Sequence, residues 1–304
     1  MIRTAIRAAI LLAVAVIAMA DILYFVPRIR LAGLWLIGRA PHCSFQEATG
    51  SFDTLARRHA IDARVKHIRD ADGLALYSTR IGDFWIPRRG EYDKMIRGLA
   101  REQLSGIYDG PDGGVRAGDT VIDCGANVGS FTRSALNSGA AVVVAIEPSP
   151  ENLRALKLNF APEIAAGRVI VEPVGVWDSA GTAKLRFNYT SAVDSLVLSA
   201  GSVGSIEVPT KTIDQIVAGH KLSKVDFVKI DVEGAEAQAV LGAQRTLKTS
   251  RPRLVLDIEV TSLDAVVEAV RRADASYRSA CLCEDMATSV RASVAYFHTA
   301  QARQ

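Results

Sequence analysis

Metal-ligand patterns, a disulfide framework and basic tracts are all missing from this sequence, and each absence excludes a class of protein. The 304 residues include four cysteines and five histidines, and the histidines are scattered without the spacing of metal ligands. We therefore expect no metal site. So few cysteines do not build a disulfide framework, and a reducing compartment fits them best. The net charge of +3 comes without a basic tract, which argues against a nucleic-acid partner.

Disorder is excluded as well. Hydrophobic residues make up 49% of the chain and charged residues 23%, which is enough apolar material for a real core. The length allows one large domain with an extension, or two small domains. Among the cysteines, Cys124 is interpreted as a small apolar residue at the end of a strand. Cys281 and Cys283 alternate in a strand-like segment, so their side chains are expected on one face.

A hydrophobic run occupies the N-terminus. Residues 8–26 are interrupted only by Asp21 and are flanked by arginines on both sides. As a helix the run would be about 28 Å long, close to the thickness of a bilayer core. We predict a single-pass, transmembrane anchor within residues 1–30. The alternative is a cleaved signal peptide, because Ala18-Met19-Ala20 resembles a small-x-small cleavage site.

The remaining chain is predicted to hold a linker or N-terminal extension over residues 31–90 and one domain over residues 91–304. From residue 119 onward, short apolar strands alternate with helices of about ten residues. That alternation indicates an α/β fold with a mostly parallel, seven-stranded sheet and helices on both faces. The expected strands are 120–123, 141–147, 169–172, 224–231, 253–259, 277–283 and 293–298, and the expected helices between them are 130–137, 150–160, 235–247 and 263–272.

A glycine-rich turn follows the first of these strands. Gly125 and Gly129 lie between the predicted strand and the next helix, where glycine lets the backbone approach a ligand closely. Acidic residues recur at the carboxyl ends of the strands, where ligands bind in such folds. These residues are Asp123, Glu147, Asp231 and Glu259.

The type of ligand follows from the turn and from the acids. Glu147 ends the next strand, where a carboxylate can accept hydrogen bonds from both hydroxyls of a ribose. The turn reads Gly-x-x-x-Gly and lacks the Gly-x-Gly-x-x-Gly pattern of dinucleotide enzymes. Asp123, ahead of the turn, would repel a phosphate but suits a cation that carries an amino group. A nucleoside with a positively charged amino-acid tail is S-adenosylmethionine.

Three blocks of sequence carry a resemblance to a known family. They are residues 121–129 (VIDCGANVG), 147–152 (EPSPEN) and 228–236 (VKIDVEGAE), with support from residues 174–181 and 208–214. In this order, they resemble the FkbM family of class I S-adenosylmethionine-dependent methyltransferases. The resemblance extends from about residue 101 to residue 259 and implies a Rossmann-like fold.

The resemblance also implies roles for individual residues. Residues in the turns after the strands would bind the methionine part and the ribose of the cofactor and border its adenine. Residues in the same turns would face the methyl group and the acceptor. The implied cofactor-binding residues are Asp123, Gly125, Ala126, Asn127, Gly129, Glu147, Pro148, Ser149, Gly175 and Asp231. The implied catalytic residues are Asp231, Glu233 and Glu259.

Methyl transfer is an in-line displacement that depends chiefly on alignment. An alcohol acceptor becomes more nucleophilic when a carboxylate takes its proton, and Asp231, Glu233 and Glu259 are the candidates. Family members commonly carry a histidine two residues after the last of these acids. This chain has Thr261 there, so the acceptor-side chemistry and the general base stay open.

The leading hypothesis is therefore O-methylation of a small-molecule, sugar or glycolipid-type acceptor. A membrane anchor would fit a lipid-linked glycan acceptor, with the catalytic domain in the cytoplasm, where the methyl donor is made. Two alternatives remain: a nicotinamide-dependent oxidoreductase, and a catalytically silent, membrane-tethered module that binds the cofactor. The acceptor, the oligomeric state, the role of residues 31–90 and the fate of the N-terminal helix are left open by the sequence.

Overall fold

Two compact units make up the computed structural model, which describes residues 6, 10, 12–19, 27–40, 42–110, 113–189, 191, 194–197, 202–258, 263–286 and 289–299. One unit combines Met1–Arg57 with Cys281–Ser293, and the other combines Arg58–Ala280 with Val294–Gln304. The predicted domain boundaries at residues 30 and 90 stay predictions.

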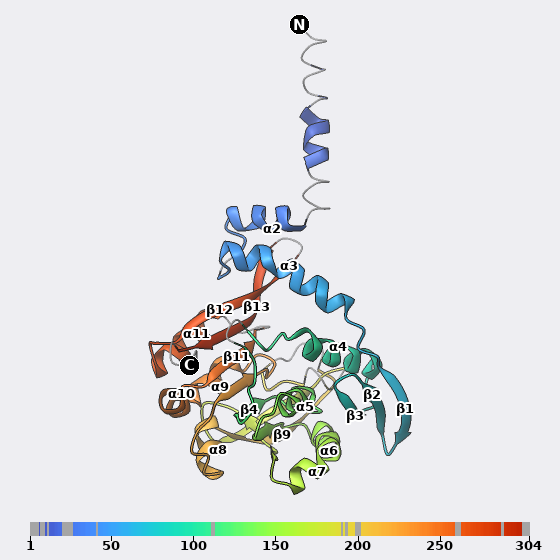
Figure 1. Cartoon of the computed structure of the whole chain (residues 1–304), viewed down its shortest axis with the longest axis vertical. Helices are drawn as coiled ribbons and strands as arrows, with labels where there is room; N and C mark the ends of the chain where they lie inside the picture. The colour runs from blue at the N-terminus through green and yellow to red at the C-terminus, as the bar shows by residue number, and fades with distance from the viewer. Residues whose placement is uncertain are drawn as a thin grey trace. The chain divides into compact units, whose positions relative to one another are not determined.

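A mostly parallel sheet of seven strands organises the larger unit, and the outer part of its terminal hairpin belongs to the smaller one (Figure 1). The strand order is β12-β13-β11-β10-β4-β5-β6. Strands β11, β10, β4, β5 and β6 are parallel, whereas β13 is antiparallel to β11. The bounds are β4 (Thr120–Cys124), β5 (Val142–Ile146), β6 (Val169–Glu172), β10 (Phe227–Ile230), β11 (Arg253–Asp257), β12 (Arg278–Met286) and β13 (Ser289–His298).

Helices flank this sheet, as Figure 1 shows. They are α4 (Tyr92–Ser105), α5 (Ser130–Asn137), α6 (Pro150–Asn159), α7 (Ala161–Ala165), α8 (Ile213–Gly219), α9 (Glu236–Leu241), α10 (Gln244–Ser250) and α11 (Leu263–Ala273). The helix predicted over residues 235–247 is two helices, separated at Gly242. A side chain at Gly242 would collide with the carbonyl oxygen of Trp177. Glycine at position 242 therefore lets the two backbone segments approach each other closely.

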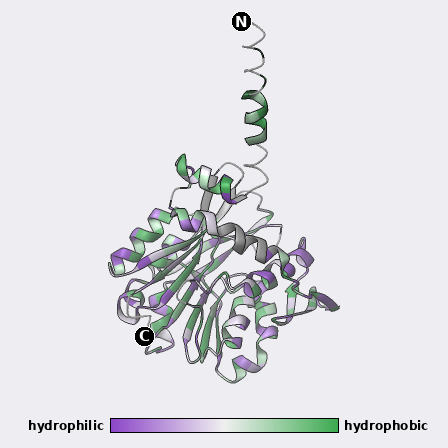
Figure 2. Ribbon diagram, turned by 45° about the horizontal axis from the view of Figure 1, so that its top comes forward, coloured by the Kyte–Doolittle hydropathy of each residue, from purple (hydrophilic) through white to green (hydrophobic). Residues whose placement is uncertain are grey.

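The central strands are buried along nearly their whole length and are mostly hydrophobic, as Figure 2 shows. Every residue of β10 is buried, and so are all residues of β4 and β5 beyond the first. Parallel strands are covered on both faces and therefore show continuous rather than alternating hydrophobicity. The parallel strand order and this burial confirm the α/β class that the alternation of strands and helices predicts and the Rossmann-like fold that the resemblance implies.

The larger unit also contains two smaller sheets. The first has the order β1-β2-β3, and the second has the order β7-β9-β8, with its strands before, within and after the polar stretch 178–204. Their bounds are β1 (Lys66–Ala71), β2 (Leu74–Thr79), β3 (Gly82–Pro87), β7 (Gly175–Val176), β8 (Gly181–Phe187) and β9 (Gly204–Lys211). Strands β1 and β8 are largely solvent-facing and polar, so they give little hydrophobic signal.

Strand β3 is tied to helix α6 of the same unit through one asparagine. The side chain of Asn159 accepts a hydrogen bond from the backbone N–H of Trp85 at 2.7 Å and donates one to its carbonyl at 3.0 Å. It also donates to the carbonyl of Val128, at 2.9 Å, beside the glycine turn. A single side chain thus fixes the first small sheet against the turn.

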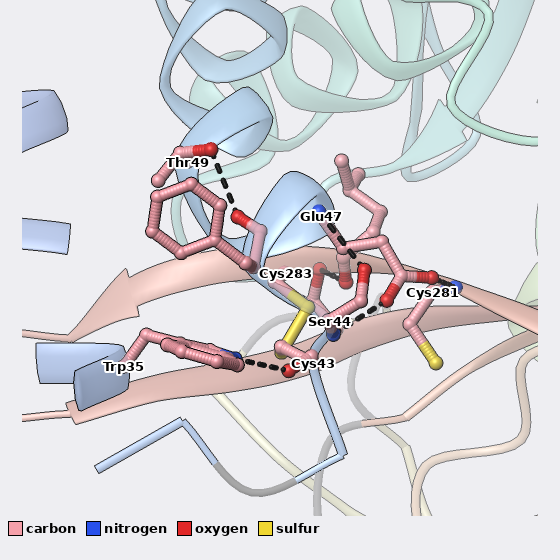
Figure 3. The surroundings of a disulfide bond; sticks show 10 residues. Trp35, Cys43, Ser44, Glu47, Thr49, Cys281 and Cys283 are labelled. Atoms are coloured by element: carbon pink, nitrogen blue, oxygen red, sulfur yellow. Dashed lines mark hydrogen bonds between the residues drawn. A yellow bond between two sulfur atoms is a disulfide. The ribbon is translucent and has the colours of Figure 1, made fainter. Parts of the chain in front are cut away.

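The smaller unit contains α2 (Pro27–Leu36), α3 (Phe45–Ala60) as far as Arg57, and a disulfide bond. Cys43 and Cys283 are joined with a Cα–Cα distance of 6.4 Å (Figure 3), and Trp35 donates its indole N–H to the Cys43 carbonyl at 3.0 Å. This bond corrects the interpretation of the cysteines as unpaired residues of a reducing compartment. Cys281 stays a free thiol, and burial raises its pKa to about 12.

The predicted membrane anchor is not supported. Of residues 8–26, the structure describes positions 10 and 12–19. Among all the described residues, no helix has both the length and the apolar character needed to cross a bilayer. The prediction of a single-pass anchor with a cytoplasmic catalytic domain is therefore wrong, and the lipid-linked acceptor that depended on it loses its basis.

The turn after β4 is where the fold constrains the sequence most tightly. Gly125 has φ +73°, and a Cβ at this position would collide with the carbonyl oxygen of Asp231, which follows β10. The backbone N–H of Asp231 also donates to the carbonyl of Cys124 at 3.1 Å. Two strand ends therefore meet at backbone distance, and only glycine fits between them.

Substitution of Gly125 by alanine tests this constraint. We expect Gly125→Ala to lower the free energy of unfolding by at least about 2 kcal/mol, because the new methyl group adds a collision to the cost of a positive φ. Gly118→Ala is the matched control, since Gly118 has φ +87° and open space around its Cβ position. Chemical denaturation measures the free energy of unfolding of both variants. Equal losses in the two would show that neighbouring atoms move enough to relieve the collision at Gly125.

Removal of the disulfide tests the smaller unit. We expect Cys283→Ser to lower the free energy of unfolding by about 2–4 kcal/mol relative to the oxidised wild type, because the bond restrains an unfolded chain over a separation of 240 residues. Cys281→Ser is the control and should behave as wild type. Peptide mapping without reduction should recover Cys43 linked to Cys283, whereas alkylation of all four thiols would contradict the assignment.

Candidate active site

A cavity of about 70 Å³ lies in the larger unit beyond the carboxyl ends of β4, β5 and β10. Its position is the one at which open α/β sheets bind ligands. The cavity brings together residues that are far apart in the sequence but were predicted to share a site. These residues are Gly125, Ala126, Asn127, Glu147, Pro148, Gly175, Asp231 and Glu233.

Three predicted residues do not line this cavity. Asp123 is fully buried beneath it, Gly129 is the N-cap of α5, and Ser149 is the N-cap of α6. A fourth, Glu259, lies outside the described residues. Asp123, Gly129 and Ser149 would therefore position the residues that line the cavity and would not touch a ligand themselves. All assignments of cofactor-binding and catalytic residues stay predictions.

Lys229 connects two of the carboxylates. Its ammonium lies 3.3 Å from Asp123 Oδ1 and 3.2 Å from Asp231 Oδ2, and it donates to the carbonyl of Gly125 at 2.9 Å. Burial lowers the pKa of Lys229, but the two carboxylates outweigh this effect and raise the pKa above its ordinary value. The lysine is therefore a permanent cation, 3% exposed, that joins β4, the glycine turn and the end of β10.

Asp123 is held on its other side by Thr132, whose hydroxyl donates to Asp123 Oδ2 at 2.7 Å. A carboxylate this deeply buried requires a cation and hydrogen bonds to offset its loss of contact with water. Lys229 and Thr132 supply them. Asp123 thus anchors the floor of the site and fixes where Lys229 points.

Glu147 is the second buried carboxylate of the site. Its two oxygens accept backbone hydrogen bonds from Asn127 and Ser149, each at 2.8 Å. Burial raises the pKa of Glu147 to about 7, although these backbone N–H groups oppose the shift. The Asn152 amide also donates to Oε1, at 3.4 Å, which leaves a lone pair on Oε2 for a hydrogen bond from a ligand.

Aromatic rings form one wall above the lysine. Tyr108 and Phe131 are in edge-to-face contact at 5.4 Å, and the ammonium of Lys229 lies 5.8 Å from the first ring and 6.0 Å from the second. The Tyr108 hydroxyl also donates to Asp231 Oδ2 at 3.4 Å. Asp231 therefore has its orientation set by a cation and by a phenol.

Glu233 follows on a turn of unusual backbone. It has φ +53° and precedes Gly234 at φ +101°, a conformation that is rare and costly for a glutamate. The hydroxyl of Ser195 donates to the Glu233 carbonyl at 2.6 Å and secures the turn. This conformation places Glu233 beside Asp231 on the lining of the cavity.

Several residues that line the cavity were not predicted from the sequence. Asn152 is 1% exposed and donates to the Ser191 carbonyl at 3.1 Å, while its Oδ1 has no hydrogen-bond partner among the described residues. Asp194 is paired with Arg89 and accepts a hydrogen bond from Ser149 at 3.2 Å. Asn152 stands inside one of the blocks that carry the family resemblance, which was its only signal.

The side chains that line the cavity suit a cationic nucleoside better than a metal ion or a phosphate. The lining carries five carboxylates, a glycine turn and aromatic rings, and Asn152 Oδ1 is a buried acceptor that lacks a donor among the described residues. Acceptors of this kind favour hydroxyl and amino groups. No cluster of His, Cys, Asp or Glu that could hold a metal is present in the part of the chain that the structure describes.

Comparisons with known proteins point in the same direction. The chain is 27% identical over 161 residues to 31-O-demethyl-FK506 methyltransferase FkbM of Streptomyces tacrolimicus, which covers 43% of this chain and 61% of that protein. It is 29% identical over 131 residues to hexuronic acid methyltransferase AglP of Haloferax volcanii, which covers 43% of this chain and 52% of that protein. The chain thus spans between about half and two thirds of the length of these relatives.

A solved structure of methyltransferase FkbM from Methylobacillus flagellatus KT is similar over 59% of this chain and 43% of that one, at 20% identity and a TM-score of 0.45. The family described as "Methyltransferase FkbM domain" matches residues 123–278. This match begins at the buried aspartate of β4 and takes in the glycine turn, Glu147 and the acids that follow β10. Because it covers just over half of the 304 residues, the chain belongs to the FkbM methyltransferase domain family.

Proposed function

We propose that this methyltransferase uses S-adenosylmethionine to methylate a hydroxyl group of a small-molecule or sugar acceptor. The observation that carries the proposal is the convergence of Glu147, Asp231 and Glu233 on one cavity beside the turn at Gly125. S-adenosylmethionine supplies a methyl group on a sulfonium cation. A pocket lined by five carboxylates, in a sequence without a phosphate-binding glycine loop, matches the charge of that cofactor and not that of a dinucleotide.

Glu147 is proposed to hold the ribose. Its carboxylate is fixed by the backbone N–H groups of Asn127 and Ser149, and its remaining acceptor positions carry only the long contact from Asn152 at 3.4 Å, which a ribose hydroxyl can replace. Two vicinal hydroxyls can donate to such a carboxylate together. Asn152, whose Oδ1 is buried without a donor, is proposed as a second acceptor for the nucleoside. The cavity is smaller than typical ligand sites of about 300 Å³ or more, so lining side chains must shift when the cofactor binds.

Asp231 and Glu233 are proposed to act on the acceptor side. Asp231 is neutralised by Lys229 at 3.2 Å and bonded by Tyr108, so it serves best to orient the cofactor's amino group and the acceptor. Glu233 lies next to it on the fixed turn and is proposed as the general base. It would take the acceptor's hydroxyl proton as the oxygen bonds to the methyl carbon and the carbon–sulfur electron pair returns to sulfur.

The acceptor class is proposed from the lining and from the relatives. Helix α4 contributes Glu102 and Gln103 to the cavity, and such side chains form hydrogen bonds with several hydroxyls at once. One relative is named a hexuronic acid methyltransferase and another a 2-O-methyltransferase. A sugar hydroxyl is therefore the first acceptor to test, in a screen that follows labelled methyl groups from S-adenosylmethionine into a panel of free and conjugated sugars.

Cofactor affinity should depend on pH through Glu147. Its pKa of about 7 means that the carboxylate gains a proton below neutrality and loses acceptor capacity for ribose hydroxyls. We expect the Kd for S-adenosylmethionine, measured by calorimetry, to rise about tenfold from pH 8 to pH 6. Glu147→Gln should bind weakly and without this pH dependence. Binding of a nicotinamide dinucleotide in place of S-adenosylmethionine would refute the proposed function.

Glu233 should affect the chemical step more than binding. Once an acceptor is found, we expect Glu233→Gln to lower kcat about 100-fold or more, as for loss of a general base, with little change in the KM for the cofactor. Glu207→Gln is the control, because Glu207 is an exposed carboxylate on β9. If Glu233→Gln keeps wild-type kcat while Asp231→Asn loses it, the general base is Asp231 instead.

A further inference from the structure

A second cavity, of about 470 Å³, lies at the opposite end of the central sheet. It opens where β4, β10 and β11 begin, beside Asp119, Asp226 and Arg253. The candidate active site lies at the opposite ends of β4 and β10, about 13 Å away along the strands. The two cavities share no lining residue.

Positive charge predominates in this second cavity. Five basic side chains line it, against the two carboxylates of Asp119 and Asp226, and its other described lining residues are hydroxyl-bearing. Both carboxylates are already engaged: Asp119 pairs with Arg253 and Asp226 with Lys224, each at 2.5 Å. The remaining lining cations are Arg116, Lys248 and Arg251.

The buried end of the cavity is rigid. Arg253 is 7% exposed, and its guanidinium pairs with Asp119 and donates to the carbonyl of Gly114. Arg251 is paired with Asp274 at 2.8 Å. These partners fix the two guanidinium groups and reduce the entropy that would be lost when a ligand binds.

Charge alone has a simpler explanation. Lys248 lies in the last turn of α10, where a cation offsets the partial negative charge of the helix end. The observation that points to a ligand is Thr299. Thr299 lines the cavity and is 3% exposed, and its buried Oγ1 has no hydrogen-bond partner within the described chain.

A buried hydroxyl without a partner costs free energy, commonly about 1–3 kcal/mol. A ligand that brings an acceptor oxygen to Thr299 would recover this cost. The surrounding guanidinium, ammonium and hydroxyl groups are donors as well, so the complementary ligand is rich in acceptors and negatively charged. Arginine forks match the oxygens of a phosphate particularly well.

We infer that this cavity is a binding site for a small phosphorylated molecule, distinct from the proposed active site. The phosphate would contact Thr299 Oγ1, Lys248 and the arginines. A volume of about 470 Å³ is within the range of small-molecule sites and larger than a phosphate alone needs. The remaining space, which has a polar lining, suits a sugar, so a hexose phosphate is the ligand class that fits.

Calorimetry on the full chain at constant ionic strength tests this inference, with inorganic phosphate and glucose 1-phosphate as probes. We expect saturable binding of one phosphate group per chain, with glucose 1-phosphate bound more tightly. Thr299→Val, which removes the hydroxyl and keeps the shape, should weaken binding about tenfold. Lys248→Gln should weaken it several-fold. Lys157→Gln, an exposed lysine on α6, is the charge-matched control and should leave binding unchanged.

Three outcomes would overturn the inference. They are the absence of saturable binding at millimolar phosphate, an equal loss in Lys157→Gln, and a preference for a nucleic-acid fragment over both small probes. Thermal unfolding shows whether Thr299→Val is folded; if it is not, the exposed Lys248→Gln variant decides. Binding of S-adenosylmethionine by the same samples distinguishes failure of this site from failure of the proposed function.

Discussion

The ion pairs of Lys229 are the interaction on which the site depends. One ammonium group neutralises Asp123 and Asp231 and also bonds to the Gly125 carbonyl. Removing it would leave two carboxylates close together with little solvent, which is strongly destabilising. The lysine therefore fixes the end of β10 against the turn after β4. Every other feature of the site, from the aromatic wall to the turn at Glu233, is placed relative to these two strand ends.

The glycine turn satisfies a steric requirement that follows from this pairing. Because β4 and β10 are adjacent and parallel, their carboxyl ends lie side by side, and the Asp231 carbonyl occupies the space of a side chain at Gly125. Parallel pairing also brings β5 and Glu147 to the same edge. The sheet topology thus brings Glu147 to the same cavity as Asp231, although the two residues are 84 positions apart in the chain.

Two findings differ from what local patterns indicate. The disulfide joins cysteines that are 240 residues apart, and no local spacing could predict that pairing. The hydrophobic run near the N-terminus matched the length of a bilayer span, yet no described helix meets the requirements for crossing one. The β7-β9-β8 sheet was missed because its strands are short or polar on their exposed faces, and Ser191 and Asp194 approach the site only through the connection between β8 and β9.

The sequence by itself determined the α/β class, the order of the main strands and helices, the family and eight of the residues that line the cavity. These depend on local signals: apolar runs, a glycine turn and acids at strand ends. Only the tertiary structure decided that Asp123 lies beneath the cavity and that Lys229 bridges two acids. It also decided that Tyr108 and Asn152 line the cavity and that a second polar cavity is present. Those features arise from contacts between distant segments, and a side chain's partners across a sheet are set by packing rather than by its neighbours in the chain.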